Sequence, residues 1–371
     1  MEQDGKADGA AGRIAIVLHD FAPGGTERIV VRLANHWAAA GRDVTILCGS
    51  EAGPARAMVG PLVAVIETVP ATPRAAGSRQ LLARRLAPII AASAPDVIVG
   101  PGNFHLPVLA ALIDRGVAAH IVAKLSNPLD RSDLSRLRNA LFGWRKRREV
   151  RGFARLVAMS DALAADALRT LPGSRITVIG EPIVERTDRI AHIAAHAPHI
   201  LVAGRLEPQK RVDLALAGFA AWDRLDAQLT IAGDGAGRAS LEQLAIRLGI
   251  AGRTSFIGHV ADTQACYAKA DMLLSTSSFE GFPAALVEAI IAGVPVVATH
   301  SSVALPEILA DASFGQIIAS NPRAIAAALE AQWTAGPINE PNRQALAQRH
   351  DASASAAQWL TLLDTVVAEH R

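Results

Sequence analysis

The stretch MLLSTSSFEGFPAALVEAIIAGVPVVA, Met272–Ala298, contains a strand, a loop, a helix and a second strand in succession. Its two ends, Met272–Ser275 and Val294–Ala298, are apolar runs of strand length. Between them, Pro283 suits the first turn of a helix, where its missing N–H costs nothing, and Gly293 suits the C-cap. Two buried strands joined through a helix predict part of a parallel sheet.

The same alternation of strands and helices extends over the chain in two series, which start at Arg13 and His199. Apolar runs that are buried on both faces and separated by helices predict doubly wound parallel sheets, an α/β class. We expect a disordered tail at residues 1–11, an N-terminal domain at 12–182, a linker at 183–198, a C-terminal domain at 199–350, and a C-terminal helix at 351–371 that packs back on the first domain.

Composition bounds the class of protein. A chain of 371 residues exceeds the usual size of one hydrophobic core, so two domains are expected. The net charge of +2 does not favour a nucleic-acid partner. Cys48 and Cys266 are far apart and provide neither a disulfide framework nor metal-ligand spacing. No apolar run approaches the roughly 18 residues that span a bilayer. We therefore expect a cytoplasmic protein that could sit against a membrane.

Charged residues follow the strands of the second domain, where ligands bind in open α/β sheets. The loop AGRLEPQKR places Arg205 and Lys210 after the first strand. A guanidinium fork and an ammonium group on one loop suit a diphosphate, although a solvated loop with incidental charges is the alternative. Gly233, in the turn of IAGDGAGR, is explained equally well by ligand approach or by turn chemistry.

Two carboxylates flank the start of the helix in the opening stretch. Glu288 lies in an otherwise apolar helix, and burial of an unpaired carboxylate is costly, so we expect a protein donor, a shifted pKa or a ligand to compensate for the burial. Glu280 stands in the preceding loop. Free amides at a helix start bind anions. This site offers donors for a diphosphate and acceptors for sugars on either side, and its loop and amide residues are Gly281, Phe282, Ala284 and Ala285.

Taken in order, the segments GGTER, RLVAMSDALAADAL, VAGRLEPQKRVDLALAGF, LTIAGDGAGRASLEQLAIRLGI, FIGHV and FEGFPAALVEAIIAGVPVVAT resemble the retaining glycosyltransferases of family 4. The resemblance covers Arg13–Leu363 and is strongest over Val202–Glu307. It implies the GT-B fold, in which two Rossmann-like domains face each other across a cleft. It further implies that Glu280 contacts the transferred sugar, that Glu288 binds ribose hydroxyls, and that Arg205 and Lys210 neutralise the leaving diphosphate.

Several residues of the first domain are also candidates. Gly24 and Gly25, in PGGTER, start a helix and could admit a phosphate, although a conformational role fits as well. The resemblance implies that these glycines approach the donor and that His105 lies near the sugar and the acceptor; a plain loop histidine is the alternative. Ser126 and Asn127 follow the strand IVAKL and are candidates for the acceptor side.

The implied reaction transfers a hexosyl or N-acetylhexosaminyl unit from a nucleoside-diphosphate sugar to an acceptor hydroxyl with retention of configuration, without a metal ion or cofactor. The EGFP variant, with Pro283, resembles branches that use UDP-linked sugars. A departure is the loop HSSVALPEIL, where Ser301–Val303 replaces a glycine pair of many relatives. A sugar-nucleotide epimerase and a non-catalytic nucleotide-sugar-binding relative are the rival interpretations.

The segment Arg131–Leu156 carries nine Arg and Lys residues against two acidic ones, with large apolar residues interleaved. Such a basic, partly amphipathic helix suits an anionic membrane surface, and a solvated basic helix is the alternative. Contact with the inner face of the cytoplasmic membrane would bring the site to a saccharide or lipid-linked acceptor in envelope polysaccharide or glycolipid synthesis.

Overall fold

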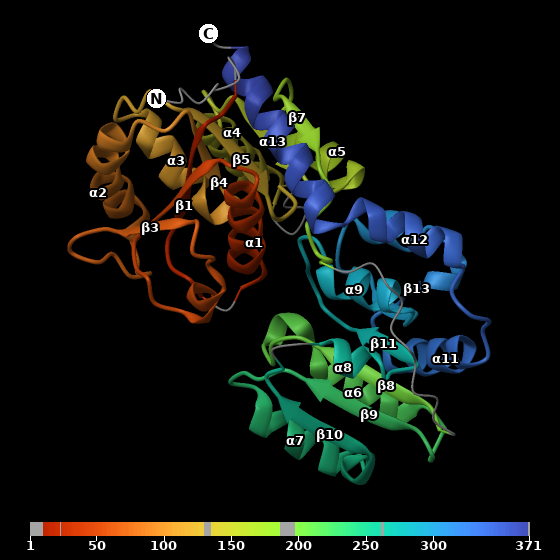
Figure 1. The fold of residues 1–371 in the computed structure, drawn as a ribbon. Coiled ribbons are helices and arrows are strands. Elements are labelled where there is room, and N and C mark those ends of the chain that lie inside the picture. Colours follow the sequence, from red (N-terminus) through yellow and green to blue (C-terminus); the bar gives the residue numbers. More distant parts are fainter. Residues whose placement is uncertain (1–9, 23, 130–134, 186–196, 261–262, 370–371) are drawn as a thin grey trace. The chain divides into compact units, whose positions relative to one another are not determined.

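A computed structural model describes residues 10–22, 24–129, 135–185, 197–260 and 263–369. The chain divides into two compact units, shown in Figure 1. The first comprises Met1–Glu185 together with His350–Arg371, and the second comprises Arg186–Arg349. Each is an α/β unit with one parallel sheet.

The first unit contains a seven-stranded sheet in the order β3-β2-β1-β4-β5-β6-β7. The order reverses direction between β1 and β4, so their carboxyl ends form a switch point. The strands are β1 (Arg13–Leu18), β2 (Asp43–Cys48), β3 (Ala64–Glu67), β4 (Val97–Gly100), β5 (His120–Leu125), β6 (Arg155–Ala158) and β7 (Ile176–Val178). The helices are α1 (Gly25–Ala39), α2 (Ser78–Ser93), α3 (Leu106–Ile113), α4 (Arg136–Glu149), α5 (Asp161–Thr170) and α13 (Ala352–Ala368), with 3₁₀ turns η1 (Pro54–Met58) and η2 (Asn103–His105).

The second unit contains a six-stranded sheet in the order β10-β9-β8-β11-β12-β13, with its switch point between β8 and β11. The strands are β8 (His199–Ala203), β9 (Gln228–Ala232), β10 (Thr254–Gly258), β11 (Met272–Ser275), β12 (Val296–Thr299) and β13 (Gly315–Ile318). The helices are α6 (Val212–Ala221), α7 (Arg238–Arg247), α8 (Gln264–Tyr267), α9 (Ala284–Ala292), α10 (Leu305–Ile308), α11 (Pro322–Trp333) and α12 (Glu340–Arg349), with 3₁₀ turns η3 (Pro208–Lys210), η4 (Ala251–Arg253) and η5 (Ala312–Phe314).

Helix α13 completes the core of the first unit. The rings of Trp37 on α1 and Trp359 on α13 are both buried, with centroids 5.9 Å apart. The Trp37 indole N–H donates to the Ala356 carbonyl at 3.2 Å. Ala11 is also fully buried, and its N–H donates to Asp364 Oδ1 at 2.8 Å. The expectation of a disordered tail was therefore wrong for Ala11, which belongs to the first unit. Residues 1–9 lie outside the described part of the chain.

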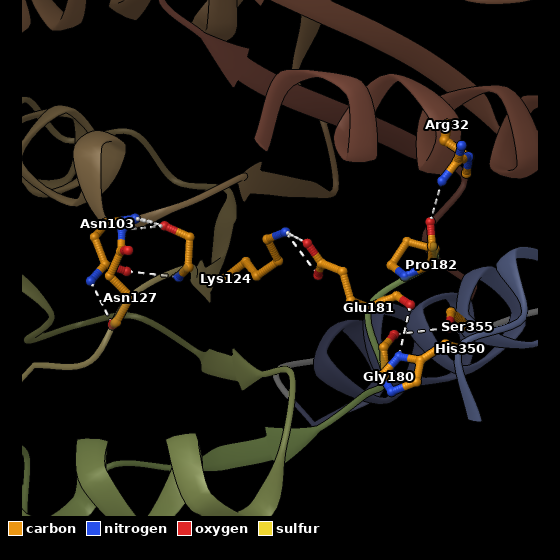
Figure 2. A network of polar contacts seen from close by, with 10 residues as sticks. Arg32, Asn103, Lys124, Asn127, Gly180, Glu181, Pro182, His350 and Ser355 are labelled. Carbon is orange, nitrogen blue, oxygen red and sulfur yellow. Dashed lines mark hydrogen bonds and ion pairs between the residues drawn. The ribbon is translucent and has the colours of Figure 1, made fainter. Parts of the chain in front are cut away.

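The chain crosses between the units twice, and both crossings are anchored in the first unit, as Figure 2 shows. The buried Lys124 Nζ on β5 lies 2.7 and 3.0 Å from the Glu181 carboxylate oxygens. The Glu181 carbonyl in turn accepts from His350 Nδ1 at 3.1 Å. Val184 pairs with Asp351 as a parallel bridge. The linker expected at 183–198 was therefore placed too early, since 183–185 belong to the first unit; residues 186–196 lie outside the described residues.

Candidate functional site

The strongest candidate site lies at the switch point of the second sheet. Lys210, on the loop after β8, donates from Nζ to Glu280 Oε1, on the loop after β11, at 2.6 Å. The side chains are only 27% and 15% exposed, so the charges are partly desolvated. The two predicted residues are thus brought into direct contact, although they lie on separate loops.

The two loops are fastened to each other by hydrogen bonds. The Thr276 hydroxyl donates to the carbonyls of Lys210 and Arg211, at 3.2 and 2.8 Å. Gln209 accepts at its carbonyl from the Ser278 N–H at 2.9 Å and donates from Nε2 to the Phe279 carbonyl at 2.6 Å. These bonds fix the backbone on both sides of the Lys210–Glu280 pair, and sequence analysis did not identify any of their side chains.

Gly233 is explained by packing of the loops after β8 and β9. Its φ of 156° suits glycine, and a Cβ there would lie 1.8 Å from the Gly204 carbonyl oxygen. The stem of Lys210 runs past Gly204, whose own Cβ would come within 3.2 Å of Lys210 Cε. Close approach of the two loops thus accounts for Gly233 without a ligand, and its role toward the donor stays a prediction.

Arg205 takes a different position from Lys210. Its side chain is 59% exposed, and its guanidinium Nη1 donates to Glu207 Oε1 at 2.9 Å. The guanidinium therefore contacts an exposed carboxylate of its own loop. The clamp for a diphosphate predicted from Arg205 and Lys210 stays a prediction.

Helix α9 begins and ends where the sequence predicted, with Pro283 before it and Gly293, at φ 94°, after it. Its amino end differs from expectation. Pro283 has φ −81° and ψ 74°, an inverse γ-turn, and the Ala284 N–H donates to the Phe282 carbonyl at 3.0 Å. The expectation of a free Ala284 amide was therefore wrong. The loop is held against the segment after β12 by the Glu280 N–H, which donates to the Ser301 carbonyl at 2.7 Å.

Glu288 is met by a protein donor. The hydroxyl of Tyr267, the single tyrosine of the chain, lies 3.1 Å from Glu288 Oε2. Tyr267 is buried, and burial followed by the negative charge of Glu288 raises its pKa well above the usual value, so it remains a donor. Glu288 itself is partly exposed rather than buried. The protein-donor interpretation of Glu288 is thus correct for one of its oxygens.

In the first unit, His105 lies at the switch point, in η2 after β4. It is 1% exposed, and neither ring nitrogen has a hydrogen-bond partner among the described residues. Burial, with the nearby Arg74 cation next, lowers its pKa to about 3. His19, after β1, is also fully buried, and its ring and that of Phe104 are T-shaped with centroids 5.6 Å apart. A second buried histidine at this switch point was missed by sequence analysis.

Ser126 and Asn127 are tied to Asn103, as Figure 2 shows in part. The Ser126 N–H donates to Asn103 Oδ1 at 2.8 Å, and the Asn103 amide donates to the Asn127 carbonyl at 2.9 Å. A Cβ at Gly102 would lie 2.6 Å from Ser126 Oγ. The structure therefore brings the predicted acceptor-side residues to the same end of the sheet as His105 and holds them in place.

Gly24 and Gly25 differ in what surrounds them. A Cβ at Gly24 would lie 2.2 Å from Glu27 Oε2, because the Glu27 side chain folds back over the loop to pair with Arg74. A Cβ at Gly25 would meet no described atom within 4 Å. The contact at Gly24 is with the far end of a flexible side chain, which could move aside, so the role of both glycines toward the donor stays a prediction; Pro23 lies outside the described residues.

Helix α4 presents apolar side chains to solvent. Leu137, Leu141 and Trp144, spaced at i, i+4 and i+7, are 85%, 58% and 54% exposed. Arginines of the same helix are exposed beside them: Arg138, Arg145, Arg147 and Arg148. The helix is shorter than the predicted segment Arg131–Leu156, because a turn and β6 follow it, and residues 131–134 lie outside the described ones.

In the described part of the chain, no cluster of three or more His, Cys, Asp or Glu side chains is arranged to hold a metal ion. Of the helices in that same part, none combines the length and the apolar character that crossing a bilayer requires.

Two family models match the sequence. "Glycosyl transferases group 1" matches residues 184–349, and "Glycosyl transferase 4-like domain" matches residues 24–181. The GDP-mannose-dependent alpha-(1-6)-phosphatidylinositol dimannoside mannosyltransferase of Mycobacterium tuberculosis is 36% identical over 144 residues, 37% of this chain and 36% of the relative. The lipopolysaccharide core biosynthesis glycosyltransferase LpsE of Rhizobium meliloti is 33% identical over 107 residues, which are 29% of this chain and 31% of the relative. The chain spans about a third of the length of the curated relatives it matches.

Solved structures match over almost the whole chain. The lipopolysaccharide outer core galactosyltransferase WaaB, in its apo form, superposes with a TM-score of 0.71 at 17% identity, covering 93% of this chain and 97% of WaaB. Anabaena HepE in complex with UDP and glucose superposes with a TM-score of 0.71 at 19% identity, covering 96% of this chain and 98% of HepE. At these identities the likeness shows a shared fold.

Proposed function

Because the chain belongs to the group 1 glycosyl transferases and has the GT-B fold, we propose that it transfers a hexosyl or N-acetylhexosaminyl unit from a nucleoside-diphosphate sugar to an acceptor hydroxyl, with retention of configuration. The observation that carries this proposal is the Lys210–Glu280 pair at the switch point of the second sheet. A cation and a carboxylate in contact there supply one group for a phosphate and one for a sugar.

In the proposed reaction, the cation stabilises the leaving group. Lys210 turns from Glu280 to the diphosphate, where negative charge accumulates as the bond to the sugar breaks. Arg205, which is exposed, leaves Glu207 to reach the same diphosphate. Glu280 is then free to accept hydrogen bonds from sugar hydroxyls. The proposal involves neither a metal ion nor a cofactor, since these side chains carry the positive charge.

Glu288 is the proposed ribose ligand. It is partly exposed, and an ionised carboxylate has about four lone-pair sites, so it can accept hydrogen bonds from ribose hydroxyls in addition to the one from Tyr267. UDP is the favoured nucleotide, because the EGFP sequence with Pro283 resembles branches that use UDP-sugars. The name of the mycobacterial relative specifies GDP-mannose, so the test must include both bases.

A thermal-shift scan with UDP, GDP, ADP and TDP tests the donor site. A nucleotide at 100 times its Kd adds about 2.7 kcal/mol to the stability of the native state. We expect one nucleotide to raise Tm, and Glu288→Ala to blunt that rise. Glu242→Ala, a partly exposed carboxylate on α7, serves as the control. No stabilisation by any nucleotide would contradict the proposal, and conversion of a donor sugar without acceptor would favour the epimerase.

The proposed acceptor is a saccharide or a lipid-linked saccharide, used in envelope polysaccharide or glycolipid synthesis at the inner face of the cytoplasmic membrane. The names of the two curated relatives point to glycolipid products. The exposed stripe Leu137, Leu141 and Trp144, with arginines beside it, suits the interface of an anionic bilayer.

Vesicle flotation tests the membrane contact. Binding to vesicles that contain phosphatidylglycerol should exceed binding to neutral phosphatidylcholine vesicles, and Leu141→Ala with Trp144→Ala should abolish the difference. Leu225→Ala removes a leucine that is even more exposed, at 82%, from the second unit and should have no effect. Equal flotation of all the variants would contradict the contact.

A further inference from the structure

A cavity of about 220 Å³ lies at the amino ends of β11 and β12, at the opposite end of the second sheet from the candidate donor site. It is lined by Asp271 and Met272, where β11 begins, and by Val294 and Pro295, which precede β12. The candidate donor site lies on the loops that follow strands. The length of β11, roughly 13 Å at about 3.3 Å per residue, therefore separates the two places.

The other walls of the cavity come from the carboxyl ends of α9 and α11. Gln332, the next-to-last residue of α11, lines the cavity and is only 7% exposed. Its carboxamide forms no hydrogen bond with the described residues. Because a buried polar group without a partner is costly, the cavity is the place where a bound molecule can satisfy this side chain.

The charges around the cavity restrict what it can bind. None of the described residues that line it is a lysine, an arginine or a histidine. The carboxyl ends of two helices carry partial negative charge, and Asp271 is the one charged side chain among the lining residues, so phosphates and other anions are disfavoured. A carboxamide both donates and accepts hydrogen bonds, whereas an ammonium group only donates. Hydroxyl groups, which do both, match Gln332 best.

We propose that this cavity binds one neutral sugar ring, with Gln332 hydrogen-bonded to its hydroxyls and Trp333 packed against its C–H groups. The volume suits a single ring, since a cavity of about 150 Å³ is enough for benzene. The lining residues Ala335 and Gly336 are exposed, so one unit of a saccharide can enter while the rest of the saccharide stays outside. The site goes beyond the proposed function, because binding here needs no transfer of the sugar.

Nuclear magnetic resonance of isotope-labelled protein tests the site through the indole N–H signals of its five tryptophans. Trp333→Phe identifies the Trp333 signal by its loss. Titration with glucose, galactose, mannose and N-acetylglucosamine should shift that signal for at least one of these sugars. Glucuronate, the anionic counterpart of glucose, should not shift it. The signal of Trp37, buried in the first unit, should stay in place throughout.

Gln332→Leu should weaken binding of the effective sugar by about tenfold, the equivalent of one hydrogen bond. Gln316→Leu is the matched control: Gln316 donates to the Ala328 carbonyl of the same helix but does not line the cavity, so its Kd should equal that of the wild type. Ala335→Phe, which enlarges an exposed lining residue, should block binding without touching the core.

Three results would overturn the proposal: an unmoved Trp333 signal with every neutral sugar, an unchanged Kd in both Gln332→Leu and Ala335→Phe, or tighter binding of glucuronate than of the neutral sugars. A sugar bound only at the candidate donor site would give the first result. Failure of nucleotide binding would contradict the proposed function and leave this site untouched, so the two failures are distinct.

Discussion

Lys210 and Glu280 neutralise each other across two loops, with Nζ 2.6 Å from Oε1. The two residues are far apart in the sequence, because strands β9, β10 and β11 lie between them in the chain. Because both side chains are largely covered, removal of one partner leaves the other as a partly desolvated charge without its neutralising group.

Replacement of Glu280 by alanine should separate binding from transfer. The freed Lys210 ammonium remains available to the diphosphate, so nucleotide affinity should be retained or increase. Transfer should fall by about a hundredfold or more, because a group that contacts the sugar in the transition state is lost. Calorimetry with nucleotide and steady-state kinetics with donor sugar measure the two effects. Glu242→Ala, which removes the ion-pair partner of Arg238 on α7, is the control and should leave the nucleotide affinity and the transfer rate near wild type.

The buried pair Lys124–Glu181 predicts a large single-mutant effect. Lys124→Met leaves the Glu181 carboxylate buried without its cation and should cost about 3–5 kcal/mol of unfolding free energy. The double variant Lys124→Met with Glu181→Leu removes both charges and should recover much of that loss. Urea unfolding followed by circular dichroism measures each step. Equal stability of the single and double variants would refute the coupling.

The buried histidine predicts acid sensitivity. The folded pKa of His105 is about 3, below the unfolded value of 6.5, so the unfolded state binds the proton more readily. The stabilising effect of the neutral imidazole is complete above pH 6.5 and is lost as the pH falls from 6.5 toward 3, by at most about 1.4 kcal/mol per pH unit. In His105→Leu, the free energy of unfolding should fall less steeply as the pH falls. Urea midpoints at pH 7, 6 and 5 compare the two proteins, and parallel curves would count against the buried neutral state.

Gly233 should tolerate no side chain. Gly233→Ala forces a φ of 156° on alanine, which alone costs about 1–3 kcal/mol, and its Cβ would overlap the Gly204 carbonyl. We expect a lower Tm and a disturbed Lys210 loop. Gly252→Ala is the matched control, since a Cβ there meets no described atom within 4 Å. A wild-type Tm in Gly233→Ala would mean that the two loops separate at little cost.

Sequence patterns predicted most of the fold because its strands are continuous apolar runs and α9 is delimited by Pro283 and Gly293. The short strands β7 and β13 were not predicted. They are only three and four residues long, and their residues are only partly buried. Burial of Ala11 also escaped prediction, because the helix that covers it comes from the far end of the chain.

The sequence singled out Lys210, Glu280 and Glu288 as candidates, but it did not predict which side chains they contact. These three residues could be recognised because their spacing along the chain, in loops that follow strands and in the next helix, is visible in the sequence. The Tyr267 hydroxyl meets Glu288 through the packing of α8 on α9, and a lone tyrosine gives no periodic signal. The Ala284 amide was misjudged because an inverse γ-turn at Pro283 depends on backbone angles that the residue types do not determine.

The return of α13 to α1 has a consequence for synthesis on the ribosome. Trp37 lies in a core that Trp359 completes, yet the whole second unit is translated between them. The second unit can fold as soon as it emerges, whereas the first must wait with part of its core uncovered until α13 follows. The unit that is made first is therefore the one whose core is completed last.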